Sequence, residues 1–126
     1  MSVGKELGDF SFTSTGVTVS STPNGGTSQQ VNMEGTASGF GAVLGTLTFY
    51  ASEAGADSGF VTWSGSSYQE DGTATGGQGR SVFDKSGANK WRVRAIIQVT
   101  GGPLILTDGE VALEGRSYTG TIHQWE

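Results

Sequence analysis

Residues 89–100 read NKWRVRAIIQVT, the one run in which large apolar residues alternate with polar ones long enough to define two faces of a strand. Successive side chains of a β-strand point to opposite faces. One face therefore carries the apolar residues Trp91, Val93, Ala95, Ile97 and Val99. The other face carries Arg92, Arg94, Ile96 and Gln98. Because the chain has only 7 Lys+Arg against 12 Asp+Glu, two arginines on one face indicate a solvated surface or the charged floor of a pocket.

Length and composition favour a single all-β domain over residues 1–126. A chain of 126 residues can bury one core and hardly two. Its 22 glycines, with abundant Ser and Thr, are typical of many short strands joined by tight turns. No window of ten residues has the apolar spacing of an amphipathic helix, and glycine interrupts nearly every segment that could form a helix. The net charge of −5 is too small to hold the chain unfolded.

Outward from this run, further strands are separated by turn sequences such as Pro23-Asn24-Gly25-Gly26. The other strands are expected at residues 9–20, 28–37, 42–52, 60–69, 73–84, 104–113 and 117–125. About eight short strands without a long crossover form a meander, and closing the sheet removes the two edges that promote aggregation. The sequence therefore predicts a small, closed, antiparallel β-barrel of about eight strands. Its interior would be filled by side chains or hold one small ligand.

Glycine is concentrated in the expected strand at residues 73–84, at Gly76, Gly77 and Gly79. Glycine inside a strand usually marks a bulge, a corner or the close approach of a large group. If residues 85–88 form the hairpin turn, Gly79 lies across from Arg94 and Ser81 lies across from Arg92. This register leaves room for two arginine side chains, and a slip of one residue would invert it. Asp108-Gly109 suggests a bulge in a later strand.

Charge and composition exclude several classes of partner. Phosphate-backbone binding needs a basic stripe, so nucleic acid is not expected. The chain has no cysteine and therefore no disulfide or thiolate metal site. The N-terminus lacks the apolar core of a signal peptide, and no apolar run is long enough to span a membrane. A cytoplasmic protein is the default expectation.

His123 is the only histidine, so a serine-protease-like triad would depend on it, and no Gly-x-Ser-x-Gly elbow accompanies it. A lone histidine in a strand is more often structural. One histidine is also too few for a zinc or iron site. A calcium site built from Asp57, Asp71 or Asp108 lacks EF-hand spacing, and the Gly-rich residues 76–80 are not a phosphate-binding loop. We therefore expect no metal and no cofactor.

The remaining candidates are charges set in or beside strands, with aromatic residues as walls. As a hypothesis, Arg92 or Arg94 stabilises an oxyanion in the lumen, while Glu70 or Glu110 accepts a proton. A buried arginine needs such a carboxylate or an anionic ligand beside it. The expected ligand-binding aromatics are Tyr50, Trp63, Tyr68, Trp91 and Trp125. In the alternative, both arginines project to solvent and Trp91, Val93 and Ile97 fill the interior, which would still suit an oily ligand.

Glycine spacing along most of the chain resembles that of small bacterial barrels of the allene-oxide-cyclase-like superfamily. The matching segments are residues 39–42 (GFGA), 68–72 (YQEDG) and 76–80 (GGQGR), and the Ser86-Gly87 turn before Lys90-Trp91-Arg92. That superfamily includes plant allene oxide cyclases, dirigent proteins and spirotetronate-forming Diels-Alderases. The resemblance implies an eight-stranded, often oligomeric barrel whose apolar lumen folds a reactive substrate without a cofactor. No catalytic motif of these enzymes matches residue by residue.

Three functions remain open from the sequence. The first is a cofactor-free cyclase or isomerase that acts on a small, mostly apolar metabolite. The second is a non-catalytic carrier or sensor of a small apolar or amphipathic molecule in the same lumen. The third is a structural role in which apolar outer strand faces bury a homo-oligomer interface.

Overall fold

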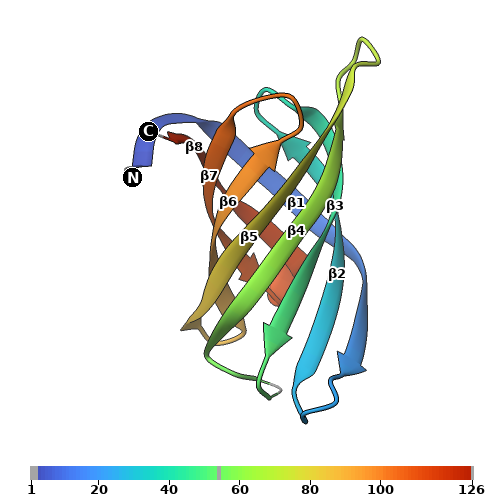
Figure 1. Cartoon of the computed structure of the whole chain (residues 1–126), viewed down its shortest axis with the longest axis vertical. Helices are drawn as coiled ribbons and strands as arrows, with labels where there is room; N and C mark the ends of the chain where they lie inside the picture. The colour runs from blue at the N-terminus through green and yellow to red at the C-terminus, as the bar shows by residue number, and fades with distance from the viewer. Residues whose placement is uncertain (1–2, 54, 126) are drawn as a thin grey trace.

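The fold of the chain is a closed barrel of antiparallel strands in meander order, seen in a computed structural model that describes residues 3–53 and 55–125. Each strand is hydrogen-bonded to the next, and the last one pairs with the first (Figure 1). The prediction of a small all-β barrel is confirmed. The strands are β1 (Val3–Ser21), β2 (Thr27–Ala37), β3 (Gly41–Ala51), β4 (Ser58–Tyr68), β5 (Ala74–Gly87), β6 (Lys90–Val99), β7 (Leu104–Ala112) and β8 (Ser117–Trp125).

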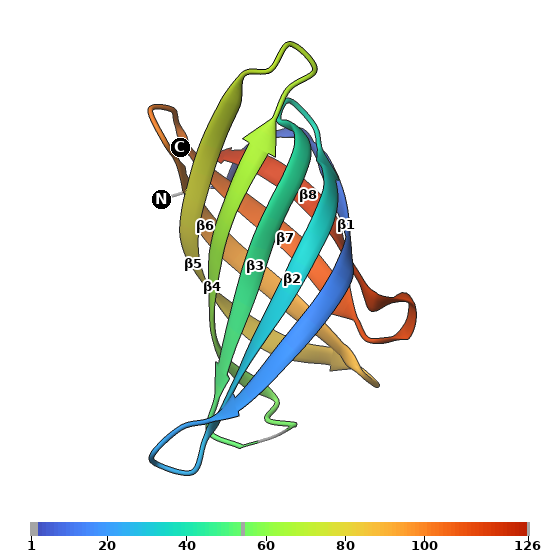
Figure 2. The ribbon, with the colours of Figure 1, turned by 90° about the vertical axis from the view of Figure 1, so that its right-hand side faces the viewer.

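The barrel has two ends with different loops (Figure 2). The turns at residues 38–40, 69–73 and 100–103 form what we call the upper end. The lower end carries the β1–β2 and β3–β4 loops, the β5–β6 turn and the β7–β8 connection, which includes the 3-10 turn η1 (Glu114–Arg116). Within residues 3–53 and 55–125, no helix has the length and apolar character needed to cross a membrane.

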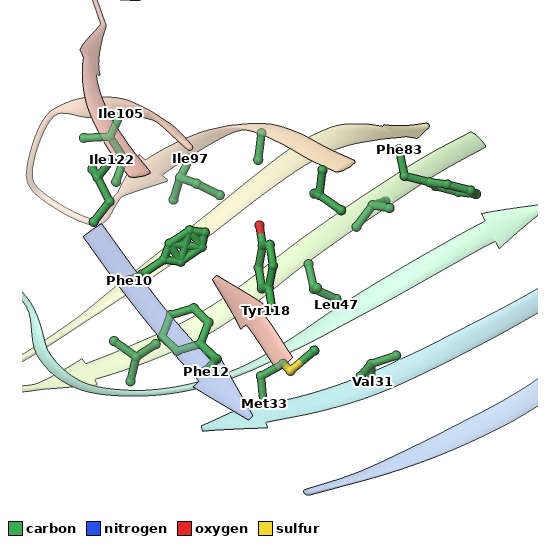
Figure 3. Close-up of a cluster of buried hydrophobic side chains, with 14 of the residues drawn as sticks. Phe10, Phe12, Val31, Met33, Leu47, Phe83, Ile97, Ile105, Tyr118 and Ile122 are labelled. Carbon is green, nitrogen blue, oxygen red and sulfur yellow. The ribbon is translucent and has the colours of Figure 1, made fainter. Parts of the chain in front are cut away.

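Alternation along the strands places one apolar set of side chains inside the barrel. The strand formed by the alternating run of residues 89–100, β6, alternates buried and exposed residues over most of its length. An aromatic cluster of Phe10, Phe12, Trp63 and Tyr118 packs in the upper half, and Figure 3 shows three of these rings together. Phe12 stacks on Trp63 with ring centroids 5.6 Å apart, and Phe10 meets Tyr118 edge-on at 4.8 Å. These contacts join three of the strands, β1, β4 and β8, across the interior.

Inward-facing glycines make the space that these large side chains need. A Cβ atom on Gly45 would lie 2.2 Å from the Trp63 ring, and one on Gly65 would lie 2.7 Å from it. A Cβ on Gly79 would lie 2.5 Å from Ile97 Cδ1 and 2.3 Å from the Ile96 carbonyl oxygen. For Gly79, the expectation that a strand glycine marks the close approach of a large group is confirmed. The group that approaches it is Ile97, whereas arginines were expected.

The predicted pairing of β5 with β6 is wrong. The turn lies at residues 88–89 instead of 85–88, with a register irregularity between Lys85 and Gly87. Gly79 consequently pairs with Ile97 instead of Arg94, three residues further along β6. Because strand side chains alternate with a period of two, an odd shift moves the arginines to the opposite face.

The predicted bulge at Asp108-Gly109 is also wrong, since β7 pairs without a register shift on both sides. Gly109 has a packing role instead. A Cβ atom there would lie 2.8 Å from both the Phe10 and Tyr118 rings.

Replacing Gly45 by alanine should therefore destabilise the barrel. The added methyl group would force the Trp63 ring out of its stack with Phe12, and overpacking of a core typically costs about 1–3 kcal/mol. Urea unfolding of Gly45→Ala measures this loss. Gly16→Ala is the matched control, because a Cβ there meets nothing within 4 Å, and it should change the free energy of unfolding by less than about 1 kcal/mol. Equal stability of the two variants would contradict the packing role of Gly45.

Candidate functional site

The two arginines of β6 lie on the outer surface of the barrel. Arg92 donates from Nε to Asp108 Oδ1 at 2.9 Å and from Nη2 to Asp108 Oδ2 at 2.6 Å. Arg94 forms an ion pair with Asp84 of β5, and both arginine side chains are 49% exposed. The hypothesis that they form a charged floor inside the lumen is wrong. The structure has the alternative arrangement, in which Val93 and Ile97 are buried inside and Trp91 is partly buried against them.

The two carboxylates proposed as proton acceptors do not reach the lumen either. Glu110 is the register partner of Arg92 on the outer face, where its carboxylate accepts a hydrogen bond from Ser86 Oγ. Glu70 is exposed in the β4–β5 turn at the upper end. The structure thus separates Glu70 from the other predicted catalytic residues, and it offers Arg92, Arg94 and Glu110 to solvent.

The Arg92–Asp108 pair predicts a pH-dependent contribution to stability. The hydrogen bond from Arg92 holds the pKa of Asp108 below its ordinary value, and partial burial opposes this effect. A lowered native pKa adds stability above the unfolded-state pKa of about 3.9, and this stability is lost as the pH falls through the native pKa.

Asp108→Asn should lower the free energy of unfolding at pH 7 by less than about 1 kcal/mol, as expected for an exposed pair. The difference from the wild type should shrink below about pH 4 and vanish near pH 2. Urea unfolding at several pH values measures it. Asp57→Asn, which alters an exposed loop carboxylate, serves as the control and should show no such trend. A difference for Asp108→Asn that stays constant from pH 7 to pH 2 would contradict the role of the ion pair.

Of the aromatic residues expected to bind a ligand, the structure places two inside the barrel. Trp63 and Trp91 pack against the buried core. Tyr50 and Tyr68 are exposed on the outer face. Trp125 is partly buried near the end of β8, where it pairs with Val3. Only Trp63 and Trp91 therefore remain as candidate walls of an internal site.

His123 also belongs to the outer face of β8. Its Nε2 atom is hydrogen-bonded to Thr121 Oγ1 at 2.8 Å. Within the described residues no group of three or more His, Cys, Asp or Glu side chains could hold a metal ion. The calcium site considered from Asp57, Asp71 and Asp108 is not assembled, since these residues lie in a lower loop, an upper turn and β7.

Three fully buried aliphatic side chains divide the lumen. Leu47, Val61 and Val93 are each at most 1% exposed and belong to β3, β4 and β6. We call these three residues the waist. The cavity above the waist and the cavity below it have no lining residue in common, and none of the waist residues lines either one. The barrel thus holds two separate compartments.

The lower cavity has a volume of about 430 Å³. Its deep walls are apolar and include Val31, Met33, Phe49, Phe83, Trp91 and Val111. Its polar lining includes Gln29, Glu53, Asn89 and Arg116, of which Glu53, Asn89 and Arg116 lie in loops of the lower end or in η1. Asn89 and Arg116 are also the two non-glycine residues with positive φ (56° and 50°) in the described chain. Sparsely populated backbone conformations of this kind often occur where a loop shapes a binding site.

The upper cavity is smaller, about 80 Å³, and its walls are largely apolar. Trp63, Phe12, Phe40 and Val99 are among its lining residues, together with Ser67 and Tyr118. Burial raises the pKa of the Tyr118 phenol, while a hydrogen bond with the Thr107 side chain acts in the opposite direction. The phenol is therefore neutral and already paired. Ser67 Oγ, by contrast, has no hydrogen-bond partner within the described residues.

Sequence reasoning missed most of the residues that line the lower cavity. The alternation in residues 28–37 did place Val31 and Met33 on one face, but nothing marked that face as the inner one. Phe49 and Phe83 were unmarked because their cavity depends on how eight strands align. Arg116 and Asn89 lie in turns, and amino-acid composition does not reveal the backbone geometry of these turns.

The outer surface carries an apolar row across three strands. Tyr50, Phe60 and Val82 are successive register partners on β3, β4 and β5, and Phe60 is 70% exposed. Adjacent exposed apolar residues are common at protein interfaces. The homo-oligomer expected from the sequence stays a prediction.

Comparisons of the chain with protein-family models, with curated proteins and with solved structures found no match.

Proposed function

We propose that this protein binds a small, mostly apolar molecule with one polar end in the lower cavity of its barrel. The observation that carries the proposal is the volume of about 430 Å³ behind a polar opening. Pockets for small molecules usually measure roughly 300–1,000 Å³ and combine apolar walls with a few polar groups. The lower cavity has both properties.

The distribution of polarity in this cavity sets the orientation of the ligand. Met33, Phe49 and Phe83 offer apolar surface in the interior, where burial of an apolar body is worth about 25 cal/mol per Å². Asn89 and Arg116 lie at the lower end, where a polar or anionic group can keep contact with water and with the guanidinium. The ligand would therefore enter with its apolar end first.

The chemistry of the lining favours binding without turnover. General acid–base catalysis needs a titratable group within hydrogen-bond reach of the reacting atom. Among the described residues of the lower cavity, the titratable side chains are those of Glu53 and Arg116, and both residues lie in the connections at its mouth. A carrier or sensor needs no more than this. The cyclase or isomerase activity implied by the allene-oxide-cyclase-like resemblance stays a prediction.

The proposal is tested with 8-anilinonaphthalene-1-sulfonate, a dye with an apolar aromatic body and one anionic group. The dye should fluoresce on binding to the wild type and should be displaced by decanoate, which has the same polarity pattern. Ala51 lines the cavity, so a phenylalanine there would occupy the space that the dye needs. Ala51→Phe should weaken dye binding at least about tenfold, or ~1.4 kcal/mol.

Ala42→Phe is the matched control, because Ala42 belongs to the same strand and is exposed on the outer face. It should bind the dye as the wild type does. Circular dichroism and thermal melting verify that both variants are folded. Equal dye affinity in the two variants, or no displacement by decanoate, would refute the lower cavity as the binding site.

A further inference from the structure

The inner face of β4 carries a serine whose hydroxyl has no hydrogen-bond partner in the part of the chain that the structure describes. Ser67 is 6% exposed, and its Oγ atom makes no hydrogen bond within the described residues. Ser67 is among the residues that line the upper cavity. Buried polar groups in native proteins are nearly always hydrogen-bonded, so an exception requires a physical reason.

Ser81, on the neighbouring strand β5, is a buried serine whose hydroxyl is hydrogen-bonded. Ser81 is buried to a similar degree, at 7% exposed, and its Oγ donates to the Val61 carbonyl oxygen at 3.3 Å. An unpaired hydroxyl lowers stability, and alanine would fill the same inward position on β4 without that cost. The Ser67 hydroxyl therefore contributes nothing to the barrel itself.

The space next to Ser67 is suited to a compact guest. The upper cavity measures about 80 Å³, roughly half of the 150 Å³ apolar cavity that is known to take benzene. Phe40, Val43, Ile97 and Val99 supply apolar wall around it. No Asp, Glu, Lys or Arg is among its described lining residues, and moving an unpaired charge into such surroundings is costly.

We propose that the upper cavity is a second binding site, specific for a small neutral molecule with one hydrogen-bond-accepting oxygen and an otherwise apolar body. Such a molecule is a short-chain ketone, whose oxygen accepts the hydrogen bond that Ser67 Oγ donates. The waist separates this site from the lower cavity, so it is independent of the function proposed above. The barrel would then take a different guest at each end.

The test uses butanone and its hydrocarbon isostere 2-methyl-1-butene as probes. Each is titrated into isotope-labelled protein while backbone amide signals are followed by NMR. Butanone should shift signals of the residues around Ser67, and it should leave the lower-end signals of Asn89 and Arg116 unchanged. Ser67→Ala should weaken butanone binding about fivefold, in line with the loss of one hydrogen bond, and should leave the affinity for the hydrocarbon the same or higher.

Ser81→Ala is the control, since it removes a buried hydroxyl that is already paired and does not line the upper cavity. It should keep the butanone affinity of the wild type. Thermal melting of Ser67→Ala should give a midpoint at least as high as that of the wild type, which excludes misfolding as the cause of lost binding. Absence of butanone binding, or equal affinity in Ser67→Ala and the wild type, would overturn the proposal and leave the hydroxyl to an ordered water.

Discussion

The closure of eight strands into one narrow barrel is the constraint on which the rest of the structure depends. Closure leaves no free sheet edge, and it fixes an interior just wide enough to be filled by side chains pointing inward from all sides. Each inward residue must therefore fit the residues across the lumen as well as those beside it. Leu47, Val61 and Val93 are the most deeply buried large side chains and line neither cavity, and cavities remain where opposing side chains do not meet.

The distribution of glycine follows from the same constraint. Large rings such as Trp63 can lie flat inside a narrow barrel only where neighbouring inward positions lack side chains, as at Gly45 on the adjacent strand and Gly65 on the same strand. The glycines thus act as partners of the aromatic cluster in packing. They also set where the lumen is filled, because the stack of Trp63 on Phe12 lies above the waist.

The ion pairs of Arg92 and Arg94, by contrast, lie on the outer surface of the barrel and make at most a small contribution to its stability. Arg92 and Arg94 are half exposed, and each has an acidic partner on a neighbouring strand. Such pairs place opposite charges side by side on the outer surface. Burying them would cost desolvation free energy that the attraction between the two charges rarely offsets. The interior can therefore stay apolar, which is the property that both proposed binding sites use.

Much of the fold was predictable from local sequence, and the site was not. Alternation and turn residues located the strands and the closed meander, because these signals act over a few residues. The position of the β5–β6 turn at residues 88–89 was not predicted, and an error of an odd number of residues in the pairing moved Arg92 and Arg94 to the wrong side. The cavities and the unpaired hydroxyl of Ser67 depend on contacts among side chains from all parts of the barrel, which no local pattern contains.

Diffraction from crystals pressurised with xenon tests most directly whether the waist divides the lumen. Xenon enters apolar cavities and is visible as strong density. We expect separate xenon sites beside Ile97 in the upper cavity and beside Phe49 and Phe83 in the lower cavity, with none between Leu47, Val61 and Val93. A continuous row of xenon sites through the waist, or a lower cavity that takes up none, would contradict the account.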